Sequence, residues 1–143
     1  MAKPIDRPLL LVLVATACAA PLRADSPLET QMDEMKYAFR GLRTGLQEPV
    51  DADKDKYVSL AEQLRDAAVK SKDYEPEKTG DIPADKRAEF LEGYRQSIDD
   101  LIALIDQLKT QLAAGDWAAA RSQIDLINQS QRDGHKEFRS EED

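Results

Sequence analysis

The chain has 143 residues, of which 41% are hydrophobic and 34% are charged, a balance typical of one small folded domain and not of a disordered or membrane-embedded chain. Its 28 acidic side chains outnumber the 20 basic ones, which argues against nucleic-acid binding because that function needs a basic face. Aromatic residues make up only 6% of the chain and helix-favouring residues fill most positions, so the composition predicts an all-α fold.

Residues 1–24 predict a secretory signal peptide. Lys3 and Arg7 supply the positive start, residues 9–20 form an apolar run, and Ala24 provides a small residue at the cleavage site. The run is too short to cross a bilayer comfortably. We therefore expect an exported protein without a transmembrane span.

Cys18 permits a second interpretation of this leader. The residues at 15–18 resemble a lipoprotein site, at which acylation of Cys18 would anchor the domain to a membrane surface. After cleavage at Ala24, by contrast, the mature domain of residues 25–143 has no thiol, so disulfides and Cys-ligated metals are excluded from it. That domain has 17 basic and 27 acidic residues, and its net charge of −10 favours solubility or steering toward a basic partner.

The first predicted helix begins after Ser26. Ser26 suits the N-cap, Pro27 suits the first helical position, and Glu29 is placed to bond back to the cap. Apolar residues then recur at steps of three and four, which places them on one face: Leu28, Met32, Met35, Phe39, Leu42 and Leu46. Pro49 interrupts this pattern.

A second helix follows, with Asp51 or Asp53 as its expected N-cap. Its apolar stripe consists of Tyr57, Leu60, Ala61, Leu64 and Ala68. Residues 72–80 end this helix, and the Pro and Gly residues between positions 76 and 83 mark the longest linker of the chain.

Residues 84–113 carry the strongest helical pattern of the chain. Its apolar positions are Phe90, Leu91, Tyr94, Ile98, Leu101, Ile102, Ile105, Leu108 and Leu112. We expect Gly115 to end this helix in the left-handed conformation and Asp116 to cap the next one. The last stripe runs through Trp117, Ala120, Ile124, Ile127, Gln131, Gly134 or His135, and Phe138.

The short turn at Gly115 and Asp116 forces the last two helices to be antiparallel neighbours. The sequence therefore predicts an all-α, up-down-up-down antiparallel four-helix bundle. It has no Gly-rich phosphate loop, no Glu-x-x-His pair and no His-Glu-x-x-His motif, which lowers the expectation of a hydrolase or a carboxylate-bridged metal enzyme.

The remaining candidates for metal chemistry are one His and the Met residues of the helical stripes. His135 lies near the end of the fourth helix and Met32 and Met35 near the start of the first, and in an up-down bundle these positions share one end. A neutral imidazole and a thioether form the axial pair of haem iron in some electron-transfer proteins. A lone His on an apolar face and a Met in a stripe are equally typical of an ordinary core.

Four segments of the mature chain keep the register of a known family: residues 28–32, 94–99, 115–117 and 134–139. Their sequences are LETQM, YRQSID, GDW and GHKEFR. Together they resemble the cytochrome b562 family, and the resemblance covers essentially the whole mature chain. The additional length relative to the family falls between the first and third helices, where insertions are tolerated.

The resemblance implies a periplasmic b-type cytochrome that transfers single electrons and is not an enzyme. One haem b per chain would be bound noncovalently, with Met32 and His135 as axial ligands, because Met32 occupies the position of the family's Met ligand. No Cys precedes His135 in a CxxCH motif, so covalent attachment there is excluded. The redox partner is not identified.

By the same alignment, the side chains around the haem are Leu28, Met35, Tyr94, Ile98, Ile127, Gln131, Phe138 and Arg139. Two positions depart from the family pattern. Gln131 replaces an Arg associated with the haem propionates, and Gly134 replaces an aromatic residue.

The alternative function is that of a haem-free periplasmic helical bundle that acts as a protein-binding module. Trp117 and the acidic residues 141–143 are compatible with such a surface role, although Trp117 also suits a core position at the start of the last helix. A second alternative is haem or metal storage without a redox role. Reversible reduction with rapid electron exchange, as opposed to binding alone, would distinguish the cytochrome from these alternatives.

Overall fold

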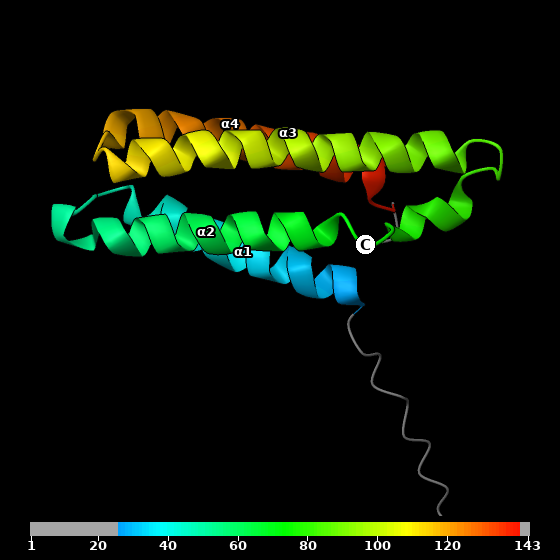
Figure 1. Ribbon diagram of the computed structural model, residues 1–143, viewed down its shortest axis with the longest axis horizontal. Coiled ribbons are helices and arrows are strands. Elements are labelled where there is room, and N and C mark those ends of the chain that lie inside the picture. The colour runs from blue at the N-terminus through cyan, green and yellow to red at the C-terminus, as the bar shows by residue number, and fades with distance from the viewer. Residues whose placement is uncertain (1–25, 141–143) are drawn as a thin grey trace, which may run out of the picture.

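The computed structural model describes residues 26–140, and in this part of the chain it contains four α-helices and no strand (Figure 1). The helices are α1 (Pro27–Gly45), α2 (Lys54–Ser71), α3 (Arg87–Ala113) and α4 (Trp117–Phe138). Two 3-10 helices, η1 (Asp51–Asp53) and η2 (Glu77–Asp81), lie in the connections. The expected signal peptide, the Cys18 lipidation site and the acidic residues 141–143 lie outside the described residues.

Successive helices run in opposite directions along the long axis, which confirms the up-down-up-down four-helix bundle (Figure 1). Each helix packs closely on the next one in the chain, whereas α1 and α4 make the fewest contacts among the four neighbouring pairs. The side of the bundle between α1 and α4 is therefore its most open side. No helix within residues 26–140 has the length and apolarity needed to cross a membrane.

Local capping fixes several helix ends as the sequence predicts. The Ser26 hydroxyl accepts a hydrogen bond from the Glu29 amide at 3.2 Å, and the Glu29 carboxylate accepts one from the Ser26 amide. Gly115 has a φ of 68°, and the Asp116 carboxylate accepts a hydrogen bond from the Ala119 amide at 3.1 Å. The α3–α4 turn is thus built by a left-handed glycine followed by a capped helix start.

Two predicted helix starts differ from the structure. Asp53 precedes α2, but neither it nor Asp51 caps the helix with its side chain, because η1 leads into α2 and its turns use backbone groups. The third helix begins at Arg87 instead of residue 84, since residues 83–86 form a turn in which the Lys86 amide donates to the Pro83 carbonyl.

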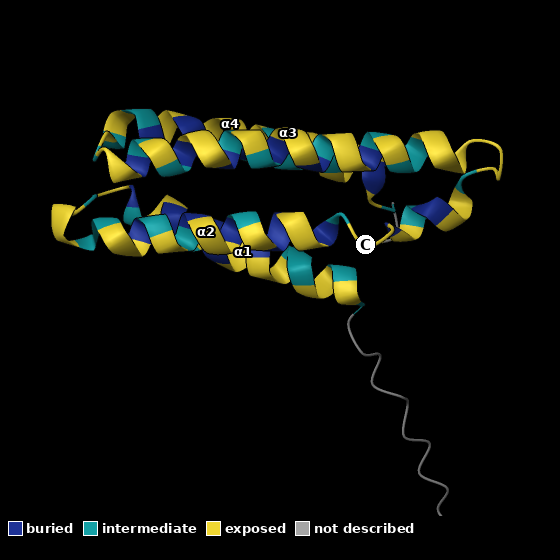
Figure 2. Ribbon diagram, in the orientation of Figure 1, coloured by how far each residue is buried: buried dark blue, intermediate teal, exposed yellow. Residues whose placement is uncertain are grey.

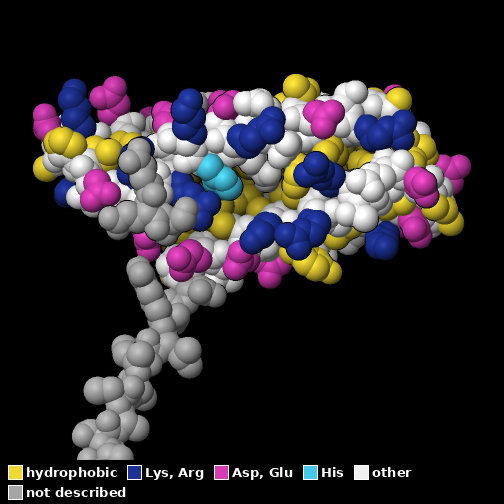
Figure 3. Space-filling model, turned by 180° about the vertical axis from the view of Figure 1, so that it is seen from behind, with side chains coloured by type: hydrophobic (Ala, Val, Ile, Leu, Met, Phe, Trp, Pro, Cys, Tyr) yellow, Lys and Arg dark blue, Asp and Glu magenta, His cyan; other side chains and the backbone are white. Residues whose placement is uncertain are grey.

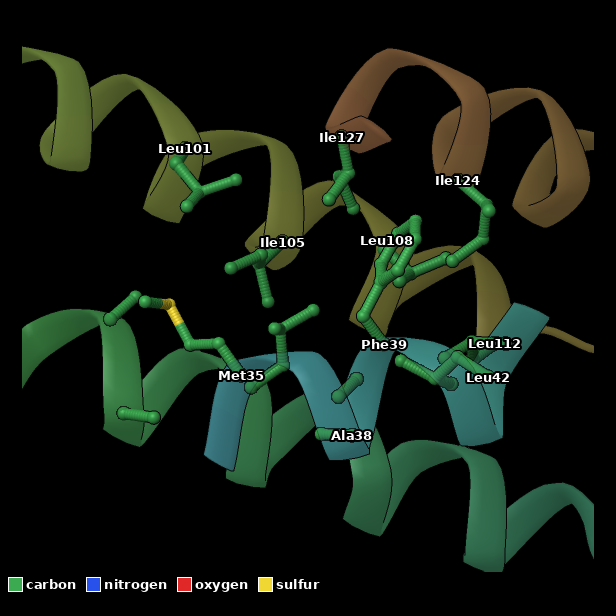
Figure 4. Close-up of a cluster of buried hydrophobic side chains, with 14 of the residues drawn as sticks. Met35, Ala38, Phe39, Leu42, Leu101, Ile105, Leu108, Leu112, Ile124 and Ile127 are labelled. Carbon is green, nitrogen blue, oxygen red and sulfur yellow. The ribbon is translucent and has the colours of Figure 1, made fainter. Parts of the chain in front are cut away.

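The inward faces of all four helices form one hydrophobic core (Figure 2). The completely buried large residues come from the predicted apolar stripes: Leu42, Leu46, Leu64, Ile105, Leu108, Leu112 and Ile127. Figure 4 shows side chains of α1, such as Phe39 and Leu42, pointing toward α3 and α4. Helical periodicity therefore identifies the core correctly.

The end of the bundle that contains the α1–α2 and α3–α4 connections is closed by aromatic contacts. Tyr57 and Trp117 meet edge to face with ring centroids 5.6 Å apart, and the Trp117 Nε1 group donates to the Asp51 carboxylate at 2.9 Å. Gly45 is required beside them, because a Cβ atom there would lie 2.6 Å from the Tyr57 ring.

Ion pairs join α2 to α3 on the side opposite the open one. Arg65 lies 2.7 Å from Asp106, Lys72 lies 2.5 Å from Asp99, and Lys109 lies 3.7 Å from Glu62. Such exposed pairs each contribute at most about 1 kcal/mol.

Candidate functional site

A cavity of about 810 Å³ lies at the end of the bundle where α1 begins and α4 ends. Its walls come from α1, α3, α4 and residues 74–77 of the α2–α3 connection. Pockets that hold small molecules and cofactors have volumes of roughly 300–1,000 Å³. The cavity is therefore large enough for a cofactor, and Figure 3 shows a hollow on the α1–α4 side with the chain's single histidine beside it.

Met32 and Met35 both reach this cavity from α1. Met35 is buried in the core, whereas Met32 is half-buried and packs against the edge of the core cluster. The two residues lie about one turn apart on the same helix. Of the two thioethers, that of Met32 is therefore the more exposed and the nearer to the start of α1.

His135 lines the cavity from the opposite helix, α4. It is an exposed residue, yet protein atoms surround part of its imidazole, and this desolvation lowers the pKa of His135, with a smaller contribution from the positive charge of Arg139. A lowered pKa keeps the imidazole neutral at neutral pH. The neutral ring is the form that binds a metal ion.

The cavity brings together nearly all of the predicted site residues. Its lining includes Met32, His135, Leu28, Met35, Tyr94, Ile98, Gln131, Phe138 and Arg139. Ile127 is the exception: it is completely buried in the core and is not part of the cavity lining (Figure 4). It precedes His135 by two turns, roughly 12 Å along α4, and so lies deeper in the bundle.

An aromatic cluster fixes one wall of the cavity. Phe138 meets Phe90 and Tyr94 edge to face, with centroid distances of 5.4 and 5.6 Å. The Tyr94 hydroxyl donates to the Ser71 carbonyl at 2.8 Å, and burial raises the pKa of Tyr94. This wall is therefore held in place by contacts to α2 and α3.

Gly134, which stands where the resemblance implies an aromatic residue, does not interrupt helix α4. Helix α4 continues through Gly134 to Phe138, and a Cβ atom at Gly134 would lie 3.5 Å from the Ser97 hydroxyl, which is an ordinary contact. Gly134 lines the cavity, so the absence of a side chain leaves space next to His135.

Several cavity residues were not predicted as site residues. Phe39 and Leu101 were assigned only to the core stripes, although the same stripes continue into the cavity. Residues 74–77 belong to the linker, and Lys78 holds this linker on α4 by donating to the Glu137 carbonyl at 2.9 Å. Lys36, Arg40 and Arg43 also line the cavity, and their spacing of four and three residues was the available signal.

The donor groups and the walls of the cavity fit a haem. A thioether and a neutral imidazole reach it from two different helices, and the remaining lining is largely apolar. Within residues 26–140 there is no cluster of three or more His, Cys, Asp or Glu residues that could hold a metal ion.

The fold and this cavity define a class of all-α bundles in which a thioether and an imidazole face a shared apolar pocket. A sequence model of the cytochrome b562 family matches residues 27–139, so the chain belongs to the cytochrome b562 family. This confirms the resemblance seen in the sequence. The family consists of haem-binding electron carriers and not of enzymes, and it is typically periplasmic. No curated protein matches the chain.

Proposed function

We propose that this chain is a periplasmic b-type cytochrome that transfers single electrons with Met32 and His135 as the axial ligands of one noncovalently bound haem b. The observation that carries the proposal is that the two side chains line one cavity from the first and last helices of the bundle. Membership of the cytochrome b562 family supports the haem and the electron-carrier role.

Each wall of the cavity has a part in this function. Met32 on α1 and His135 on α4 line the cavity, and their thioether and imidazole would hold the haem iron. Haem, when bound, supplies a reversible one-electron couple. If both side chains bound the iron, no coordination position would remain for a substrate, which would favour electron transfer over catalysis.

The polar residues of the lining determine which side chains would bind the haem carboxylates. Gln131 offers a neutral amide where the family has an Arg, and a hydrogen bond from a neutral donor is roughly half as strong as one from a charged donor. Arg139 lines the cavity one turn after His135 and provides a charged donor. We therefore assign the carboxylate contact on α4 to Arg139 more than to Gln131.

An optical titration with haem tests the proposal. The parent protein should give a sharp low-spin spectrum after reduction with dithionite, because two strong axial ligands hold the iron. Met32→Ala and His135→Ala should each lose this spectrum or become high-spin. Met35→Leu is the matched control, since it removes the neighbouring thioether but keeps an apolar core side chain of similar volume.

Three results would contradict the proposal. The first is a parent protein that gives no low-spin spectrum at saturating haem, and the second is identical behaviour of the two ligand variants and the Met35→Leu control. The third is a low-spin spectrum that is lost in Met35→Leu and kept in Met32→Ala. The last result would transfer the axial role to Met35. Replacing Met32 by His should also lower the midpoint potential, because the soft thioether favours ferrous iron.

A further inference from the structure

The side of the bundle between α1 and α4 carries basic residues beside the cavity. On α1, Lys36, Arg40 and Arg43 follow one another at steps of four and three residues, so they share one flank of the helix. All three are exposed, and all three line the cavity. Figure 3 views this side and shows dark blue side chains grouped around the cyan histidine.

Helix α4 adds Arg121 and Arg132 to the same side. The Arg121 guanidinium donates to the Leu46 carbonyl at 3.5 Å, which places it against the end of α1. Arg132 lies about 60° from His135 around the helix, and it donates to the neutral Gln129 amide oxygen at 2.8 Å. We call Lys36, Arg40, Arg43, Arg121 and Arg132 the basic face.

The charges of the basic face have no acidic partners within residues 26–140. None of the five residues forms an ion pair there, whereas Arg65 and Lys72 on the α2–α3 side are paired with carboxylates at 2.7 and 2.5 Å. The acidic residues of the cavity lining lie in the first turns of α1 and in the linker: Glu29, Asp33, Glu75 and Glu77. Positive charge is therefore concentrated along the middle of the α1–α4 side.

We propose that the basic face is the docking surface for an acidic, carboxylate-rich electron carrier. This inference rests on the proposed function, because a partner must approach the cavity to exchange an electron with a haem held there. The net charge of the whole chain is −8 and alone would favour a basic partner. Screening limits the reach of a charge to about 8 Å at physiological ionic strength, so a docked partner experiences mainly the charges at the contact.

Small redox reagents of opposite charge test the electrostatics of this face. The haem-loaded, reduced protein is mixed in a stopped-flow instrument with hexacyanoferrate(III) or with tris(phenanthroline)cobalt(III). In each reaction one electron leaves the ferrous haem, which becomes ferric, and reduces one reagent molecule to hexacyanoferrate(II) or to the cobalt(II) complex. We expect the anionic reagent to react faster at low salt, and its rate to fall as salt is added.

The variant that decides the question combines Lys36→Gln, Arg40→Gln and Arg43→Gln. It should lower the low-salt rate with hexacyanoferrate(III) by about tenfold and raise the rate with the cobalt complex. The matched control combines Lys56→Gln, Lys70→Gln and Arg95→Gln, which remove the same charge from exposed positions on α2 and α3. We expect the control to change either rate by less than about twofold.

A titration with poly-L-glutamate tests docking without haem. Amide chemical shifts of the isotope-labelled full-length protein should change on α1 and α4, and the α1 triple variant should abolish these changes. Failure to load haem would contradict the proposed function, while this titration would still decide the docking surface. The docking proposal is overturned if the chemical-shift changes are confined to α2 and α3, or if both triple variants change the rates equally. It is also overturned if the α1 triple variant binds haem more weakly, because that result would assign the cations to the haem carboxylates.

Discussion

At the end of the bundle that holds the α1–α2 and α3–α4 connections, Tyr57 and Trp117 fill the space between the helices, whereas at the other end Met32 and His135 border a cavity of about 810 Å³. Both ends are built from amphipathic helices of similar composition. At the closed end the side chains pack against one another, whereas at the cavity end they line a volume that contains no protein atoms. Since unfilled apolar space loses dispersion contacts, the cavity end should be the less stable one until a ligand fills it.

The largest expected effect is a difference between two identical substitutions. Leu112→Ala removes a completely buried side chain and should lower the free energy of unfolding by about 2–5 kcal/mol. Leu28→Ala removes a half-buried side chain that already borders the cavity, so it should cost less than about 1.5 kcal/mol. Urea denaturation of both haem-free variants measures this, and equal losses would mean that the two ends are packed alike.

Haem binding should raise the free energy of unfolding of the protein as a whole. At a free haem concentration of one hundred times Kd, binding to the folded state alone adds about 2.7 kcal/mol to the free energy of unfolding. Thermal denaturation with and without haem measures the gain. His135→Ala should lose most of it, and a gain unaffected by that substitution would place the bound haem outside the cavity.

Two helical glycines, one at each end of the bundle, test the same difference in packing with smaller expected effects. Gly45→Ala forces a Cβ atom to within 2.6 Å of Tyr57 and should destabilise the protein by about 1–3 kcal/mol. Gly134→Ala meets no close contact and should instead stabilise the haem-free protein by about 0.5–1 kcal/mol, because alanine favours the helix. Chemical denaturation distinguishes the signs, and a destabilising Gly134→Ala would show that the space beside His135 is already full.

The last expected effect concerns Tyr94 in the wall of the cavity and depends on pH. Burial raises the pKa of Tyr94, so the folded state keeps the phenol proton to higher pH than the unfolded state does. Its contribution to stability should therefore be complete below about pH 10 and be lost as the pH rises through the folded-state value. Tyr94→Phe should cost about 1 kcal/mol at neutral pH, through the lost hydrogen bond to Ser71, and should weaken the alkaline decline. A decline of the same slope in both proteins would assign it to other groups.

Much of the fold follows from local sequence signals. Ser26, Gly115 and Asp116 act on neighbouring residues, so their roles can be predicted without knowledge of the rest of the bundle. Periodicity identifies the buried faces for the same reason. Asp53 does not cap α2 with its side chain, because η1 leads into α2 through backbone groups. No periodic pattern in the sequence predicts η1.

The site is only partly predictable, because it depends on which residues meet across helices. The resemblance predicts Ile127 beside the haem; this side chain is completely buried in the core and is not part of the cavity lining, so its contact with a haem stays a prediction. Residues 74–77 belong to the α2–α3 connection, which is held over the cavity by contacts such as that of Lys78 with the end of α4. Net charge averages the paired α2–α3 side with the unpaired α1–α4 side, so it does not show how charge is distributed over the surface.

The open contact between α1 and α4 also has a consequence for folding kinetics. Met32 and His135 are separated by more than one hundred residues, so bringing them together closes a long loop. The contacts within the α1–α2 and α3–α4 hairpins close shorter stretches of chain, and such contacts form faster than contacts of higher sequence separation. Met32 and His135 should therefore come together last, so the cavity that they border should be completed only when the two hairpins dock.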